Sequence, residues 1–480
     1  MVKLIEFLNN IKRNKHNNTF MMIGFVLIIL FILQWIFDTY DPNFHDFAHS
    51  FLWDDISVKY RIFHNRLFLG DPRDTFGDFF QVVLGCFDRN PYQNSFHSSY
   101  PSLVLLIALI ISRFLNIDPN LNNIEIIATY KGKIVIILII FLFIFIMYFL
   151  IMKILKSNFI HKRKRIILFL FILISQPLLF SLQRGNFILF AFIFLLGFIA
   201  FYGNNNKLLN ELSLLFLALA VCCKLYPAVF SILLLKNNEI NRREKIKQIF
   251  HLTGYIFICF FIPFCFFKGG FSNIGVLLTN IRDFSANSEM TLNYHNQEVL
   301  YNFWLTGNLS IGSFTKIIGC IFFNKNIPYF LPMFNSLAII NTLFVIIVLL
   351  ILLIVIKKKW KVLSIMGISC VLILNNSFFY TLLFMIPGLL YFYIDYSREL
   401  VPKFKHVYAL CFILMFTPLQ FGFLLSPMNM GNLPLFYGYT INSLFQTIAC
   451  CCFLLLFIFE EVIAFYLKFK LSSKDIIKND

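Results

Sequence analysis

The sequence predicts an all-α polytopic membrane protein, a single domain with a bundle of about twelve transmembrane helices. Two observations predict this class. Of the 480 residues, 59% are hydrophobic and 14% are charged, whereas soluble globular proteins are about 45–50% apolar. The basic residues fall in short clusters between long apolar runs, as they do in cytoplasmic loops. The net charge of +17 therefore indicates such loops, and we expect no nucleic-acid partner.

The N-terminal residues predict a retained first span with a cytoplasmic N-terminus. An apolar run over residues 20–37 has four cations ahead of it and no small-residue cleavage site behind it. The segment that follows, 38–133, is then the first extracytoplasmic loop. Within it, residues 38–100 carry nine aspartates against five basic residues, the reverse of the balance in the whole chain. Its aromatic and proline content predicts short helices on the membrane surface.

The rest of the chain predicts spans that cross the membrane alternately outward and inward. Residues 102–115 make a helix of about 21 Å, too short to cross, and are expected at the interface. We expect crossings near 134–152, 166–182, 185–202, 208–222, 250–267, 362–374, 378–394, 406–425 and 442–467, a further one in the apolar run that ends at 356, and a short half-crossing at 228–235. A second external segment covers 268–328 and includes a surface or re-entrant helix at 304–323. In this map every basic cluster and both termini lie in the cytoplasm.

A few strongly polar residues interrupt the apolar runs between residues 181 and 227. Arg184, Gly185 and Asn186 separate two apolar runs with almost no loop, and Lys224 ends a third run. A cation at the bilayer centre costs about 2.5 to 3.5 kcal/mol on insertion scales. Each of these cations is therefore expected either to meet an anionic partner or to extend towards lipid phosphate.

The order of these residues resembles the core signature of glycosyltransferase family 87, membrane enzymes of the GT-C fold that use a polyprenyl-phosphate sugar. The matching residues are Arg184, Gly185, Asn186, Lys224, Tyr226 and Pro227. Tyr100 and Pro101 resemble the family's YPP element, and Asn296 and Gln297 resemble its NQS segment. In the late motif Phe378 stands in the Trp position, while Tyr380 and Thr381 stand where the family has histidine.

The resemblance implies a role for each matched side chain. Arg184 and Lys224 would bind the donor phosphate. The substrate-binding residues would be Asn186, Tyr226, Asn296, Gln297 and Tyr380.

A carboxylate in the first external loop is implied as general base for the acceptor hydroxyl. The stretch HDFAHSF makes Asp46 the closest match to the family's loop, with Asp41 second and the adjacent pair Asp54 and Asp55 third. The external histidines show no metal-ligand spacing, and the first loop has no DxD. We therefore expect neither a metal nor another cofactor.

The function expected from these features is transfer of a hexose to an extracytoplasmic glycan, glycolipid or lipid acceptor. Mannose is the hexose that the resemblance favours. The donor is a polyprenyl-phosphate sugar, and the enzyme lies among membrane lipids of a bacterial plasma membrane. Two other classes stay open. A carrier or flippase of lipid-linked saccharides would place charges near the bilayer midplane and break helices there. A surface-polysaccharide polymerase or ligase would carry its large external loop late in the chain.

Overall fold

A computed structural model describes residues 76–417, with short gaps, and residues 441–477. The gaps are 88–89, 94–97, 117–124, 127–128, 159, 238–239, 288, 295–296, 303–307, 323–326, 375–376, 399 and 401–403. Residues 26 and 29 of the first predicted span are also described, both as helix. The rest of that span, and the loop up to residue 75, lie outside the described residues.

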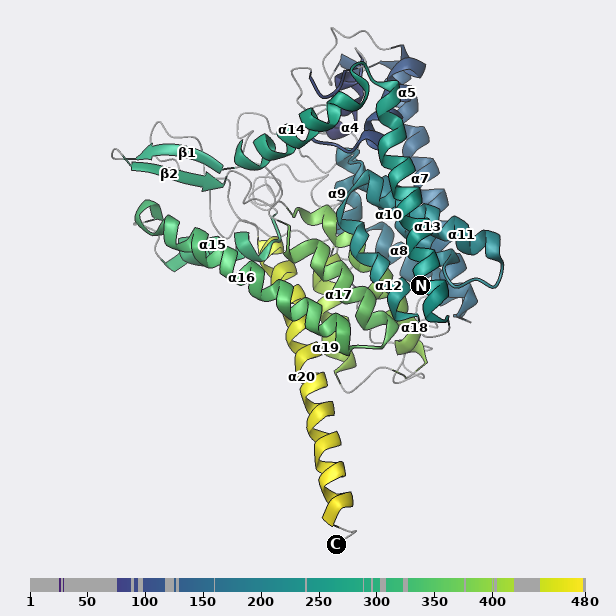
Figure 1. Cartoon of the computed structure of the whole chain (residues 1–480), viewed down its shortest axis with the longest axis vertical. Helices are drawn as coiled ribbons and strands as arrows, with labels where there is room; N and C mark the ends of the chain where they lie inside the picture. The colour runs from purple at the N-terminus through teal and green to yellow at the C-terminus, as the bar shows by residue number, and fades with distance from the viewer. Residues whose placement is uncertain are drawn as a thin grey trace.

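The described chain is a bundle of helices with one β-hairpin at its side (Figure 1). The helices are α4 (Gly77–Gly85), α5 (Ser102–Leu115), α7 (Tyr130–Ser157), α8 (Lys162–Leu173), α9 (Gln176–Arg184), α10 (Ile188–Phe201), α11 (Lys207–Cys223), α12 (Ile232–Lys236), α13 (Arg242–Phe261), α14 (Asn273–Asn287), α15 (Ile311–Phe322), α16 (Ile327–Val355), α17 (Lys359–Leu372), α18 (Ile386–Ser397), α19 (Lys405–Phe416) and α20 (Ile441–Ile477). Short 3-10 helices are η2 (Tyr226–Ser231), η3 (Ile262–Phe266), η4 (Gly270–Ser272) and η5 (Phe379–Met385). The antiparallel hairpin pairs β1 (Glu289–Tyr294) with β2 (Gln297–Asn302).

Among the described residues, five helices are long and apolar enough to cross a membrane. They are Tyr130–Ser157, Arg242–Phe266, Met333–Val355, Phe379–Ser397 and Asn442–Tyr466. The pair α8 and α9, bent by 55°, makes a sixth if it is one span. Two other predicted crossings are shorter apolar helices, α10 and α19, and α5, which was expected at the interface, is also too short to cross. The apolar helices thus agree with a membrane protein, while the count of about twelve spans stays a prediction.

The bend between α8 and α9 follows from local sequence. Pro177 lies in the first turn of α9, where its missing N–H costs no helical hydrogen bond. The Ser175 hydroxyl donates to the Ile172 carbonyl oxygen at 2.6 Å and so occupies a carbonyl at the end of α8. The chain therefore stops one helix and starts another within the same predicted crossing.

Basic segments from separate parts of the chain meet at one end of the bundle, called the basic end below. The Lys236 ammonium donates to the Ile356 carbonyl oxygen at 2.5 Å, which joins the ends of α12 and α16. Arg398, after α18, donates to the carbonyl oxygen of Asn158, after α7, at 2.8 Å. In Figure 1, α18 lies near this end and α4 and α5 lie at the opposite one. These contacts bring four of the basic segments together, while the grouping of every basic cluster on one side of a membrane stays a prediction.

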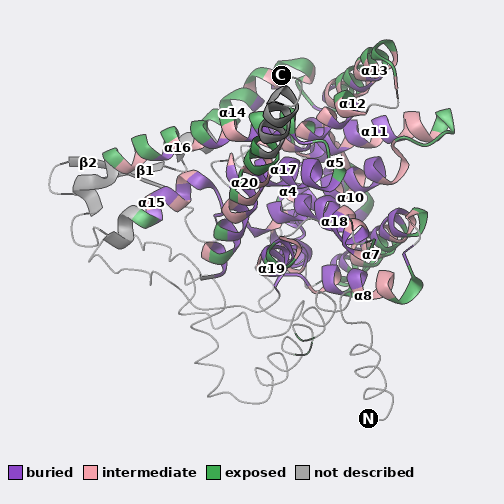
Figure 2. Ribbon diagram, turned by 90° about the horizontal axis from the view of Figure 1, so that it is seen from below, coloured by how far each residue is buried: buried purple, intermediate pink, exposed green. Residues whose placement is uncertain are grey.

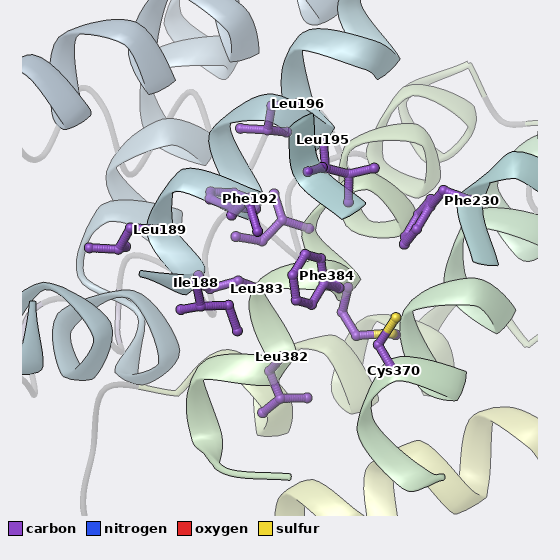
Figure 3. Packing of buried hydrophobic residues seen from close by; sticks show 14 of the residues in the cluster. Ile188, Leu189, Phe192, Leu195, Leu196, Phe230, Cys370, Leu382, Leu383 and Phe384 are labelled. Atoms are coloured by element: carbon purple, nitrogen blue, oxygen red, sulfur yellow. The ribbon is translucent and has the colours of Figure 1, made fainter. Parts of the chain in front are cut away.

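The centre of the bundle is packed around α10, whose sequence is apolar on every face. Figure 3 shows Phe192 and Leu195 of α10 beside Phe230 of η2 and the side chains of Leu383 and Phe384 in η5. All five side chains are buried, and Figure 2 shows the same buried centre from below. This core fixes the ends of α10, η2 and η5 relative to one another.

Candidate functional site

Helix α9 ends in a tight turn at the QRGN sequence. Gly185 caps the helix in the left-handed region, with φ of 62°, which glycine adopts without a steric penalty. Its N–H donates to the Leu182 carbonyl oxygen at 3.2 Å, and the N–H of Asn186 donates to that of Ser181 at 3.1 Å. The turn leaves Arg184 half-buried at the end of the helix and Asn186 buried beside it.

Helix α4, from the first external segment, packs directly onto this turn. The Phe76 N–H donates to the Gln183 carbonyl oxygen at 2.6 Å. The Phe79 ring stacks on that of Phe187, with centroids 5.4 Å apart. A Cβ atom at Gly185 would lie 2.7 Å from the Phe76 ring and 2.9 Å from the Phe79 Cβ. Glycine is therefore required here both for its backbone angle and for the close approach of α4.

This packing places the Asp78 carboxylate on the polar residues of the turn. A guanidinium nitrogen of Arg184 lies 2.7 Å from Asp78 Oδ1, and Asn186 Nδ2 donates to Asp78 Oδ2 at 2.8 Å. The Asn186 amide oxygen in turn accepts from the Ile188 N–H at 3.0 Å. The side chains of Arg184 and Asp78 are 32% and 16% exposed, so the pair is shielded from bulk water but reachable. Charge-assisted hydrogen bonds of this kind are about twice as strong as neutral ones.

Lys224 brings a second cation to the same place from the end of α11. Its ammonium lies 4.4 Å from the centre of the Tyr100 ring, a cation–π contact. Burial lowers the pKa of Lys224 to about 8, although Asp78 and Cys223 act in the opposite direction. The ammonium is therefore mostly protonated at neutral pH and loses its proton as the pH rises through about 8.

Three half-buried tyrosines surround these charges. Tyr380, in η5, stacks on Phe180 of α9 with centroids 6.0 Å apart and interacts electrostatically with Asp78 and Arg184. Tyr226, in η2, meets the Phe384 ring edge to face at 5.3 Å. The pKa of Tyr100 is raised well above its ordinary value, first by burial and then by Asp78 and Tyr380, while Arg184 opposes the rise. We call the seven residues of this site the polar cluster: Asp78, Tyr100, Arg184, Asn186, Lys224, Tyr226 and Tyr380.

The polar cluster lies less than one bilayer thickness from the basic end. Helix α10 runs from the cluster in 14 residues, a rise of about 21 Å. Its far end reaches Tyr202, whose hydroxyl accepts from Asn237 Nδ2, after α12, at 3.4 Å. A hydrocarbon core is about 30 Å thick. The end of α10 at the polar cluster is therefore closer to its end at the basic end than the thickness of a hydrocarbon core.

The structure brings five of the sequence-predicted site residues together: Arg184, Asn186, Lys224, Tyr226 and Tyr380. Asp41, Asp46 and Asn296 lie outside the described residues. Gln297 begins strand β2 opposite Tyr294, and its side chain is not described. The predicted base residues are thus untested, while the predicted phosphate-binding pair shares one site.

Two members of the cluster had no assigned role in the sequence. Asp78 is one of nine aspartates in its segment, and the signal that could have singled it out is the apolar sequence FFQVVLG that follows it. An acid in the first turn of a helix is stabilised by the helix dipole. Tyr100 had been matched only as part of a Tyr-Pro element, although its aromatic ring contacts the Lys224 ammonium.

Within the described part of the chain, no group of three or more His, Cys, Asp or Glu side chains could hold a metal ion. Comparison of the chain with family models, with curated proteins and with solved structures finds no match.

Proposed function

We propose that the protein is a membrane glycosyltransferase that takes a hexose, mannose first, from a polyprenyl-phosphate donor and that the polar cluster binds the donor phosphate. The observation that carries this proposal is the meeting of Arg184 and Lys224, from the ends of α9 and α11, around Asp78. The order of these residues in the sequence is the one that resembles glycosyltransferase family 87.

The charge of the cluster suits such a ligand. With Lys224 protonated, the three charged members of the polar cluster, Arg184, Lys224 and Asp78, sum to 2 − 1 = +1. A sugar joined to a polyprenyl phosphate is a phosphodiester with a single negative charge. An arginine fork and a lysine ammonium both donate to phosphate oxygens, and a partly desolvated site strengthens those bonds. Binding would neutralise the cluster.

The aromatic side chains suit the sugar. Tyr100, Tyr226 and Tyr380 keep part of their surface accessible and present both ring faces and hydroxyl groups. Such side chains pack on the apolar face of a hexose and bind its hydroxyl groups. In the family's pattern Tyr380 stands where a histidine is usual, so a phenol would replace an imidazole beside the phosphate.

The reaction proposed is a displacement at the anomeric carbon. The acceptor oxygen bonds to this carbon, the bond from the carbon to the phosphate oxygen breaks, and its electron pair leaves with the polyprenyl phosphate. The hydroxyl proton passes to a carboxylate of the first external loop, for which Asp46 is the first candidate and Asp41 the second. Asp78, with Arg184 and Asn186 bonded to its two oxygens, acts as a positioning residue.

The remaining parts of the proposal concern the whole molecule. We propose the GT-C fold with about twelve spans, termini in the cytoplasm and a site that opens to the extracytoplasmic side.

The direct test uses membranes that contain the protein, incubated with radiolabelled polyprenyl-phosphate mannose and separately with the glucose donor. Label is then counted in lipid, glycan and protein fractions. We expect protein-dependent transfer out of the donor lipid, lost in Arg184→Gln. Absence of transfer from both donors, to any fraction, would contradict the proposal.

One observation favours a second function, a carrier of lipid-linked saccharides. Two predicted crossings are interrupted, 166–182 by the α8–α9 bend and 378–394 by the change from η5 to α18. Broken helices around midplane charges are typical of transporters. Movement of intact labelled donor across a sealed vesicle, with no transfer of its sugar, would favour the carrier.

A further inference from the structure

A compact group of cations at the basic end takes no part in the polar cluster. It surrounds the turn between α7 and α8, where Arg398 donates to the Asn158 carbonyl oxygen at 2.8 Å. Figure 2 shows α7 and α8 side by side at the edge of the bundle. We call this group the α7–α8 corner: Lys156, Lys162, Arg163, Lys164, Arg165 and Arg398.

The start of α8 concentrates positive charge where a helix tolerates it least. Lys162, Arg163 and Lys164 occupy its first turn, with no acidic residue there, and His161 at the N-cap makes no side-chain hydrogen bond. Cations near the positive end of a helix dipole are unfavourable, each by a few tenths of a kcal/mol to about 1 kcal/mol. Within the described part of the chain, these three cations form no ion pair. Their charge is therefore not balanced by described residues.

Another basic helix start in the same molecule is partly compensated by its own residues. Helix α13 also begins with two arginines, yet Glu244 lies in its first turn. The Asn241 side chain caps this helix by accepting from the Glu244 N–H at 2.8 Å. Lys245 donates to the Leu235 carbonyl oxygen at 2.8 Å. Helix α13 thus has an acidic residue and a side-chain cap at its start, whereas α8 has neither. An anion from outside the chain could supply the missing negative charge at α8.

The surface next to the corner is apolar, which identifies the kind of anion. Phe149 on α7 is 56% exposed and Leu170 on α8 is 42% exposed. Tyr148, also exposed, packs edge to face against Phe169 at 5.1 Å. An anion with acyl chains would meet both the cations and this apolar surface, whereas a soluble anion would meet only the cations.

We propose that the α7–α8 corner binds the phosphate groups of anionic phospholipids in the leaflet at the basic end. The lipid phosphates compensate the charge at the start of α8, and the acyl chains lie along the exposed side chains of α7 and α8. The inference does not depend on the proposed transferase activity.

The test compares two matched triple variants of the full chain in nanodiscs. One is Lys162→Gln, Arg163→Gln, Lys164→Gln, which leaves Arg165 in place because its Nε atom is buried. The control is Arg242→Gln, Arg243→Gln, Lys247→Gln, which leaves the Lys245 contact intact. Thermal unfolding is measured in phosphatidylcholine alone and with phosphatidylglycerol added, and retained phosphatidylglycerol is counted by native mass spectrometry.

We expect the α8 variant to unfold at a higher temperature than the wild type in one lipid and at a lower temperature in the other. In phosphatidylcholine it should unfold at a higher temperature than the wild type, because the repulsion at the start of α8 is gone. With phosphatidylglycerol, the wild type and the control should unfold at a higher temperature than the α8 variant. The α8 variant should also retain about tenfold less phosphatidylglycerol than they do. Equal retention by both triple variants would overturn the proposal. The proposal would also be overturned if inorganic phosphate raised the unfolding temperature of the wild type as much as phosphatidylglycerol does, because the corner would then be a site for soluble anions.

Discussion

Asp78 joins two parts of the chain that are 106 residues apart, through its ion pair with Arg184. Without it, Arg184 and the nearby Lys224 would be two cations in a region of low polarity, which is costly for each of them. The carboxylate therefore has a structural role without ligand and a positioning role when a phosphate binds. These two roles predict different behaviour with and without ligand.

Replacing Asp78 with Asn tests this dual role. The amide keeps the shape but removes the charge, so we expect the unliganded protein to lose about 1–3 kcal/mol of unfolding free energy. Polyprenyl phosphate should restore part of the loss, because its phosphate supplies the missing negative charge. Thermal unfolding of wild type and variant, with and without polyprenyl phosphate, measures both effects. An identical loss in the two conditions would assign Asp78 a structural role alone.

The lowered pKa of Lys224 predicts a pH dependence. Below pH of about 8 the ammonium is protonated and can bind phosphate, and above it the neutral amine cannot. We therefore expect kcat/KM for the donor, which reports the free enzyme, to fall as the pH rises through about 8. In Lys224→Arg the fall should move to higher pH, since a guanidinium keeps its proton. A fall at the same pH in this variant would assign the titration to another group.

At the residue scale, the sequence identified the two cations but not their anion. Arg184 and Lys224 are conspicuous because each interrupts or ends an apolar run. Asp78 belongs to a segment rich in aspartate, and only the packing of α4 on the α9 turn distinguishes it. Long-range packing of this kind leaves no periodic signal in one sequence.

The elements that build the site are short helices that end at it. Helices α9 and α11 carry the cations on or next to their last residues, and α4 begins with the carboxylate. The contact between α4 and the α9 turn depends on Gly185, which has Phe76 and Phe79 against it. Local backbone geometry at one glycine thus controls whether three elements share a site.

Replacing Gly185 with Ala should separate α4 from α9. The new methyl group would clash with the Phe76 ring and would also strain a backbone with φ of 62°, a combined cost of about 1–3 kcal/mol or more. Cys86, which is buried just after α4, should then react faster with a thiol reagent, as followed by mass spectrometry. Gly203→Ala is the matched control, because its φ is also positive but no atom lies within 4 Å of the new Cβ. Equal Cys86 reactivity in both variants would contradict the packing role.

At the element scale, the apolar runs predicted most helices well. The run at 134–152 is α7, and the short run at 102–115 is helix α5 with the same bounds. The bend after α8 and the 3-10 turns η2 and η5 were not predicted, because prolines near a helix start permit a bend without setting its angle. The hairpin of β1 and β2 was not predicted either, although the sequence of β1, EMTLNY, alternates between polar and apolar residues as a half-buried strand does.

The basic end and the polar cluster lie in different parts of the molecule. The basic end gathers cations from α7, α8, α13 and α16 to α18, and the polar cluster lies towards the other end, where α4 and α5 are found (Figure 1). The positive-inside rule then predicts that the basic end faces the cytoplasm and the cluster opens to the outside.

Cysteine labelling tests this orientation. In a background from which the exposed Cys265 has been removed, Ser95→Cys should react with an impermeant reagent in intact cells. Ser157→Cys, at the basic end, should react only after the cells are opened. The reverse pattern would invert the whole orientation and place the cluster on the cytoplasmic side.

The central claim is that Arg184 and Lys224 together bind the phosphate of a lipid-linked sugar. The most direct measurement is equilibrium binding of radiolabelled polyprenyl-phosphate mannose to the purified protein and to Arg184→Gln, Lys224→Gln and the double variant. The account predicts at least about tenfold weaker binding in each single variant, since each loses a charge-assisted hydrogen bond. It also predicts a loss in the double variant that differs from the sum, because both cations contact one ligand. Unchanged donor affinity in the double variant, with the fold intact, would contradict the claim.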